Sequence, residues 1–568
     1  MTNTGKILPF HRDGAFLTRR GDRFMAEGKF IEALDSYRQA LLQEPKNAEY
    51  ALNVSHIYTE MGYYTLSNEV LWTLLQTEEE SQPECLFGLG CNYLGMQDYT
   101  NASILFQRYL AIDEEGEFSE DAYDFLDMID NYDDDEEYDE DLSLPELYDV
   151  AQKDANDGKQ LLDDGKFAEA EVLLRRAVNA NADLYYARNN LALSLFFQNK
   201  FDEAITHTKA VLARFPDSIH ALCNMLLFYR HGAGNVAIEK DEYVEALLAK
   251  KPTETEELYK IGITFSELGM HKNAQQYFGL LLQKSPYDAQ LLHYVAASCY
   301  NNGDYREAIV HWQNIGRILP DNTISDYYVE LALQAQKGNT PGIAVHYGFQ
   351  VPHEEIVNRI RKINYLANHE DELKDEWYTN PQLPALFAWG LQLHDRTIKR
   401  ALLILLNALP GEDAQRLLQN FLLDHAQPDR IKQDIYPILK ALGVPEPYIA
   451  YVDGHLVEVV LSTATEELAN LTEEEQEVYH YVVSVLQGRF DYDFTFDLLD
   501  LWSSILKETK SVVTKNSVRF YAAALDYVFC QRESDQPPTQ QEVSYLYKVS
   551  VHSLGRYAKK LREGWVET

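Results

Sequence analysis

The hydrophobic pattern of residues 14 to 337 recurs about every 34 residues. Each copy contains a turn residue, an aromatic residue two positions later and then a small residue, as in GKFIEAL from Gly28 and GDYREAI from Gly303. The small residues are 34 or 35 positions apart, or twice that: Ala33, Ser67, Ala102, Ala170, Ala204, Ala274 and Ala308. A period of this length predicts pairs of helices that stack in series.

The residue types in each copy suit two closely crossing helices. A glycine or alanine in the first helix and an alanine in the second are small enough for the helix axes to approach. Pro252, Pro286 and Pro320 recur every 34 residues, where proline ends the second helix. Each pair buries its large apolar residues only against its neighbours, so the pattern predicts an elongated all-α stack.

This pattern resembles the tetratricopeptide repeat. The residues that match its signature are Leu17, Gly21, Phe24, Ala33, Tyr37, Ala40 and Pro45 in the first copy, and Leu258, Gly262, Phe265, Ala274, Phe278 and Pro286 in the seventh. The eighth copy departs with Ala296 for the glycine and Cys299 for the aromatic residue. The resemblance implies an α-solenoid of about eight repeats that binds proteins or peptides on its concave surface.

An acidic segment interrupts the period between Ala102 and Ala170. Residues 113–141 contain 17 acidic residues and no Lys or Arg. The apolar residues Tyr123, Phe125, Leu126 and Ile129 predict a capping helix in its first half. We therefore expect a first repeat set at 14–130, an acidic linker at 131–144 and a second set at 145–337. The linker is a solvated spacer or a docking tail for a basic partner.

Residues 338–470 have a different pattern. A loop, GNTPGIAVHYGFQVP, precedes an amphipathic helix, and two helix pairs follow that resemble HEAT repeats more weakly. Residues 448–460 alternate around Asp453-Gly454, which predicts a β-hairpin packed on the helices.

Residues 471–568 predict a separate helical domain. Thr472 with Glu475, and Thr539 with Glu542, form capping boxes at two helix starts. The end of the chain resembles a helix-turn-helix and the cyclin-like fold. Two residues depart from that pattern: Lys548 occupies the turn position usually held by glycine, and Gly555 lies in the last helix.

Composition restricts the class of function. The net charge is −40, from 90 acidic and 50 basic residues, which disfavours a large surface that follows a phosphate backbone. The five cysteines form no CxxC pair, and the N-terminus has no apolar signal-peptide core. We therefore expect a cytoplasmic protein that is not embedded in a membrane. No catalytic or metal-binding motif occurs, so we expect no enzyme activity, cofactor or metal.

The repeats indicate where a partner would bind. Numbering each repeat so that the small residue of its second helix is position 20, position six holds Asn53, Asn190 and Asn224. The resemblance implies that asparagine at this position faces the groove, where its amide can both donate to and accept from a peptide backbone. Lys159 and Arg188 would meet carboxylates of the same peptide.

A second surface is basic. Within residues 540–562, five cations accompany one acid, Glu542: Lys548, Arg556, Lys559, Lys560 and Arg562. Two functions follow. The first is a non-catalytic scaffold or adaptor that binds an unidentified protein or peptide. The alternative is a transcription-linked regulator whose C-terminal domain binds DNA. The sequence does not indicate the oligomeric state.

Overall fold

The computed structural model divides the chain into two compact units, Met1–Arg361 and Lys362–Thr568. It describes residues 13–77, 82–134, 146–231, 237–338, 344–380, 382–409, 411–452, 454–459, 471–486, 494–509, 513–515, 517–533 and 537–563. Most of the predicted acidic linker and Asp453 of the predicted hairpin turn lie outside these residues. The domain limits inferred above therefore stay predictions.

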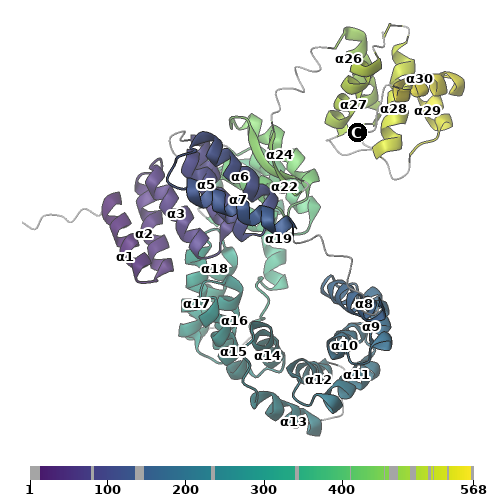
Figure 1. The fold of residues 1–568 in the computed structure, drawn as a ribbon. Helices are drawn as coiled ribbons and strands as arrows, with labels where there is room; N and C mark the ends of the chain where they lie inside the picture. The colour runs from purple at the N-terminus through teal and green to yellow at the C-terminus, as the bar shows by residue number, and fades with distance from the viewer. Residues whose placement is uncertain are drawn as a thin grey trace, which may run out of the picture. The chain divides into compact units, whose positions relative to one another are not determined.

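Helices that pair in chain order build the first unit (Figure 1). They are α1 (Gly14–Ala26), α2 (Phe30–Gln43), α3 (Ala48–Glu60), α4 (Tyr64–Thr77), α5 (Gln82–Gly95), α6 (Tyr99–Ile112), α7 (Ser119–Asp134), α8 (Glu146–Asp163), α9 (Phe167–Ala180), α10 (Tyr185–Phe197), α11 (Phe201–Arg214), α12 (Ile219–His231), α13 (Ala237–Leu248), α14 (Thr255–Glu267), α15 (His271–Lys284), α16 (Ala289–Asn301), α17 (Tyr305–Ile318) and α18 (Thr323–Gln336). The next helix, α19 (His353–Ala367), crosses the boundary between the units. The prediction of stacked helix pairs is confirmed.

Close helix crossings explain the small residues of the repeat. A Cβ atom added at Gly262 would lie 2.6 Å from the ring of Phe278, and one at Gly90 would lie 2.6 Å from the ring of Phe106. Both distances are well inside van der Waals contact. Each glycine therefore makes room for the aromatic residue of the helix that pairs with it.

In the repeats whose turn the structure describes, the turn between the paired helices has a left-handed backbone. Gly28, Gly165 and Gly303 have φ angles of 70°, 76° and 86°. In two repeats another residue takes this conformation, Gln97 at 63° and Asn199 at 61°. Glycine adopts positive φ without steric penalty, so the backbone conformation accounts for the glycine that begins most of the motifs.

The first repeats dock on the last ones. Phe30 of α2 stacks on Tyr287, which precedes α16, with ring centroids 5.3 Å apart. Tyr63 donates to the Tyr287 carbonyl over 2.7 Å, and Tyr287 donates to the Gly28 carbonyl over 3.0 Å. Buried residues of α2 and α3 share one hydrophobic core with those of α12 to α18.

The predicted capping helix is present as α7. Phe125 packs on Phe106 with ring centroids 5.4 Å apart, and Ile129 is buried. The prediction is wrong for one residue of the apolar stripe. Tyr123 is 47% exposed, and the neighbouring Ala122 is buried instead. The stripe follows Ala122, Phe125 and Ile129 because residues three to four apart share a helix face.

The second unit continues with helix pairs and one hairpin. Its elements are α20 (Glu370–Thr379), α21 (Gln382–Leu391), α22 (Arg396–Asn407), α23 (Glu412–Leu423), α24 (Asp429–Ala441), β1 (Tyr448–Val452), β2 (His455–Val459), α26 (Glu473–Leu486), α27 (Phe494–Thr509), α28 (Val518–Glu533), α29 (Gln540–Leu546) and α30 (Val551–Glu563). The strands pair antiparallel with Val452 opposite His455, which confirms the hairpin. Tyr448 of β1 is buried and stacks on Tyr436 of α24. The hairpin therefore packs on the helices through β1.

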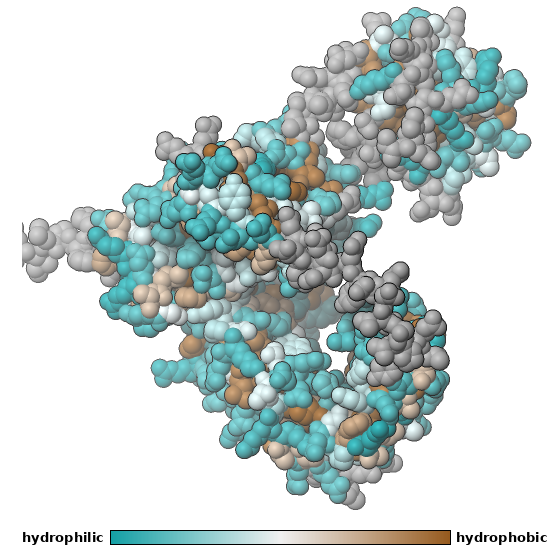
Figure 2. Space-filling view, in the orientation of Figure 1, coloured by the Kyte–Doolittle hydropathy of each residue, from teal (hydrophilic) through white to brown (hydrophobic). Residues whose placement is uncertain are grey.

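Local signals in the C-terminal helices are confirmed. Thr539 and Glu542 form the predicted capping box, and Thr472 and Glu475 exchange the same pair of hydrogen bonds. Lys548 has a φ of 52°, as expected at a turn position usually held by glycine. The likeness of residues 471–568 to a cyclin-like domain stays a prediction. Among the residues that are coloured by hydropathy, hydrophilic ones predominate on the visible face (Figure 2).

Candidate functional site

The first helices of the second repeat set hold the predicted groove residues. Lys159 is exposed on α8, and Asn190 is partly exposed on α10. Within the part of the chain that the structure describes, neither side chain has a hydrogen-bond or ion-pair partner in the fold. Both are therefore free to meet a ligand. Asn53 lies on α3, so it belongs to the first repeat set.

Asn224 occupies the matching position on α12 but is only 1% exposed. Its Nδ2 atom donates to the Asn189 carbonyl of α10 over 3.4 Å. The side-chain oxygens of Asn189 and Asn224 are both buried without a hydrogen-bond partner. The expectation that Asn224 faces an open groove does not match this position, because the neighbouring helix α10 covers it.

Arg188 lies apart from Asn190. Residues two positions apart on an α-helix point in nearly opposite directions. Arg188 is instead close enough to His207 of α11 to influence it: burial lowers the pKa of His207, and the Arg188 charge lowers it further. The structure thus does not bring Arg188 and Asn190 together on one face, although the sequence interpretation grouped them.

Lys260 on α14 belongs to the site and is missing from the sequence interpretation. Counted from Ala274, it occupies position six, as Asn190 does when counted from Ala204. Burial is the main cause that lowers its pKa, and the nearby Cys223 and Glu256 oppose that shift. It makes no ion pair within the described chain. The repeat count could have found Lys260, but only asparagine was considered at position six.

Polar contacts connect some of these first helices in pairs. Asn224 joins α12 to α10 through the bond to Asn189. The hydroxyl groups of Tyr259 on α14 and Tyr294 on α16 lie 3.1 Å apart. These contacts join α10 to α12 and α14 to α16. Asn190 and Lys260 are partly exposed at position six of α10 and α14.

The five predicted basic residues lie on α30 or at the turn that precedes it. Three of them, Arg556, Lys559 and Lys560, line a recess of about 540 Å³ that contains no acidic residue. The other residues that line this recess are Thr514, Ser517, Tyr521 and Tyr557. Lys560 donates to the Tyr521 hydroxyl over 2.7 Å. Arg562 lies over the ring of Tyr527, 5.5 Å from its centroid.

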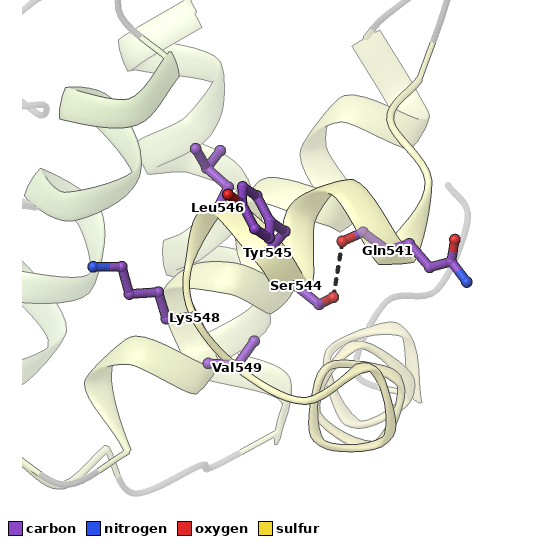
Figure 3. Close-up of a pocket in the computed structure, with 6 residues that line it drawn as sticks. All are labelled: Gln541, Ser544, Tyr545, Leu546, Lys548 and Val549. Atoms are coloured by element: carbon purple, nitrogen blue, oxygen red, sulfur yellow. Dashed lines mark hydrogen bonds between the residues drawn. The ribbon is translucent and has the colours of Figure 1, made fainter.

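Lys548 lines a different recess, of about 650 Å³, at the turn between α29 and α30 (Figure 3). Its other lining residues are Gln541, Ser544, Tyr545, Leu546 and Val549. Tyr545 is 87% exposed. The side chains of Lys548 and Gln541 point in opposite directions (Figure 3). Lys548 therefore lines a different recess from Arg556, Lys559 and Lys560.

One group of potential metal ligands occurs among the residues that the structure describes: Cys299, Glu307 and His311, whose ligand atoms lie within 4.8 Å of one another. Burial, with the Glu307 and Asp304 charges, raises the pKa of the Cys299 thiol to about 12. None of the described helices combines the length and apolarity needed to cross a membrane.

Comparison with known proteins agrees with the geometry. Two family models described as tetratricopeptide repeat match residues 161–226 and 258–286. These two stretches are similar to the tetratricopeptide repeat. The chain is similar to the TPR repeat-containing protein YvcD of Bacillus subtilis (strain 168), with 28% identity over 319 residues. The match spans 55% of this chain and 63% of YvcD, less than two thirds of that relative.

Solved TPR structures are also similar to parts of the chain. The yeast Tom70 structure has 15% identity and a TM-score of 0.26, and the match covers 75% of this chain and 90% of that one. A thermophilic TPR protein of Thermus thermophilus has 18% identity and a TM-score of 0.26, with 32% of this chain and 98% of that one covered.

Proposed function

We propose that the protein is a non-catalytic adaptor that binds an extended segment of a partner protein along α8, α10, α12 and α14. TPR proteins generally act as protein-interaction scaffolds, which supports this class of function. The observation that carries the proposal is Lys260. A partly buried lysine without an ion pair is unfavourable, and here it occurs in a chain with 40 more acidic than basic residues.

The chemistry of the face defines the partner segment. The Asn190 amide can donate to a backbone carbonyl and accept from a backbone amide, so it holds a peptide without reading its sequence. Lys260 and Lys159 favour a carboxylate on that peptide, because a hydrogen bond between charged groups is stronger than a neutral one. The expected ligand is therefore an extended, acidic segment.

Partner affinity measured with three variants tests the proposal. A partner captured from extract by the full chain, with and without nuclease, would be purified and its affinity measured. Lys260→Glu should weaken binding by about 1.5–3 kcal/mol, and Asn190→Ala by about 1 kcal/mol. Lys272→Glu makes the same charge change on the second helix of the same repeat, where Lys272 is exposed, and should leave affinity unchanged. Equal losses for Lys260→Glu and Lys272→Glu would reject the site.

The family models and the curated relative do not favour the DNA-binding alternative. A captured partner that depends on nucleic acid would be lost after nuclease treatment. The proposal expects the partner to be retained.

A further inference from the structure

Residues 344–352 join α18 to α19 without helix or strand and lie on the face of α16 and α18. Val345 and Val351 are buried at its two ends, 6% and 3% exposed. A connecting segment of this kind ordinarily runs over the surface with its backbone solvated. Here side chains of the repeats bind its backbone instead.

Asn301, at the end of α16, holds the backbone of Val345 at both polar atoms. Its Nδ2 donates to the Val345 carbonyl over 2.9 Å, and its Oδ1 accepts from the Val345 amide over 2.8 Å. An asparagine that pairs with both backbone groups of one residue binds main chain of any sequence. Asn301 therefore binds the backbone of Val345 in the same way that it would bind the backbone of a separate peptide.

His293, two turns earlier on α16, binds the next residue. Its Nδ1 accepts from Trp312 Nε1 over 3.1 Å, which leaves the proton on Nε2. That Nε2 lies 3.2 Å from the His346 carbonyl, to which it donates. On α18, Tyr328 donates to the Gln350 carbonyl over 2.7 Å. Three side chains of the repeats thus satisfy four backbone atoms of the segment.

Two aromatic residues anchor the segment. The hydroxyl of Tyr347 lies 2.9 Å from His271 Nδ1 and accepts from Ser298 Oγ over 3.2 Å. Its ring lies 5.9 Å from the ring of Phe278. The Phe349 ring lies 5.2 Å from that of His293. The anchors are two positions apart and partly buried against the core of the repeats, and aromatic residues that pack in this way carry much of the energy of peptide recognition.

We propose that α16 and α18 form a second peptide-binding site, specific for a non-helical segment with aromatic residues at positions i and i+2. The chain's own residues 344–350 occupy this site, and a partner segment of the same chemistry competes with them. The backbone contacts through Asn301, His293 and Tyr328 are independent of side-chain identity, and the two aromatic contacts supply the selectivity. This site uses different residues from the α8–α14 face, so it does not depend on the proposed function.

A labelled peptide tests the proposal. The probe has the sequence AVHYGFQVP of residues 344–352 with a fluorescent group at its N-terminus, and anisotropy reports binding to the full chain. The double variant Tyr347→Ala with Phe349→Ala removes both anchors of the internal segment while leaving the site intact. It should bind the probe saturably, and the wild-type chain should bind it at least about tenfold more weakly, because the internal segment is present at high effective concentration.

Two controls make the result decisive. Adding Asn301→Ala to the double variant should weaken probe binding at least about tenfold, because two hydrogen bonds to the backbone are lost. A probe with alanine at both aromatic positions should not bind. If the double variant unfolds, Tyr347→Phe removes only the hydroxyl contacts and should increase probe binding over wild type. No probe binding to a folded variant, or equal binding to wild type, would overturn the proposal.

Discussion

Arg317 on α17 donates a hydrogen bond over 2.9 Å to Asp35 on α2, although 282 residues separate them in the chain. Arg38 of α2 reaches back to the carbonyl groups of Arg317 and Ile318. The first repeats are therefore held against the end of α17 by paired ionic and backbone contacts, and the two repeat sets are not independent.

Arg317→Ala should loosen this contact. Both side chains are about a third exposed, so the expected loss is small, about 1 kcal/mol or less. Hydrogen exchange of α2 amides should become faster, while that of α10 amides should not change. Unchanged exchange in α2 would mean that the remaining contacts, including those of Tyr287 with Phe30 and Gly28, hold α2 in place without Arg317.

The left-handed turns give a test of backbone energetics. Gln97→Gly should raise thermal stability by up to about 1 kcal/mol, since positive φ is unfavourable for a residue with a Cβ atom. Asn199→Gly should raise it less, because asparagine tolerates this conformation. Gly303→Ala should lower it by about 1–2 kcal/mol. No atom lies within 4 Å of a Cβ at Gly303, so any loss comes from the backbone. Calorimetry of the three variants decides this, and a neutral Gly303→Ala would contradict it.

Acidification should destabilise the α16 face. Burial lowers the pKa of His293 from 6.5 to about 4. Between these values the unfolded chain binds a proton that the folded chain does not, so stability falls as the pH decreases through this window. The melting temperature should decrease between about pH 7.5 and about pH 5. His293→Gln keeps a hydrogen-bonding side chain without titrating there, so its melting temperature should decrease less; an identical decrease would exclude His293 as a source.

The sequence predicts the helices well and the binding face only in part. The repeat period depends on contacts between adjacent helices, so it appears directly in the spacing of Ala170, Ala204 and Ala308. Position six led to Asn190, which is partly exposed on α10, and its role in binding stays a prediction. Position six could not show that α10 covers Asn224, because burial depends on how neighbouring pairs twist against each other.

Residue type and long-range contacts account for the rest. Lys260 was not predicted as a site residue, because a lysine on a helix usually indicates a solvated face. Helix α20 was not predicted either, because its sequence lacks a strong apolar stripe. The composition of residues 338–352 indicates a loop, and the described part of it is non-helical. Its contact with Asn301 could not be inferred, because the two partners are 44 residues apart.

Photo-crosslinking from position 190 tests the central claim most directly. A photoreactive phenylalanine analogue replaces Asn190 on the proposed face, or Val172, which is 65% exposed on the second helix α9. The full chain is irradiated in cells and its adducts are identified by mass spectrometry. The account predicts a discrete adduct with one acidic segment of a partner protein from position 190 and none from position 172. Adducts of equal yield from both positions, or none from position 190, would contradict it.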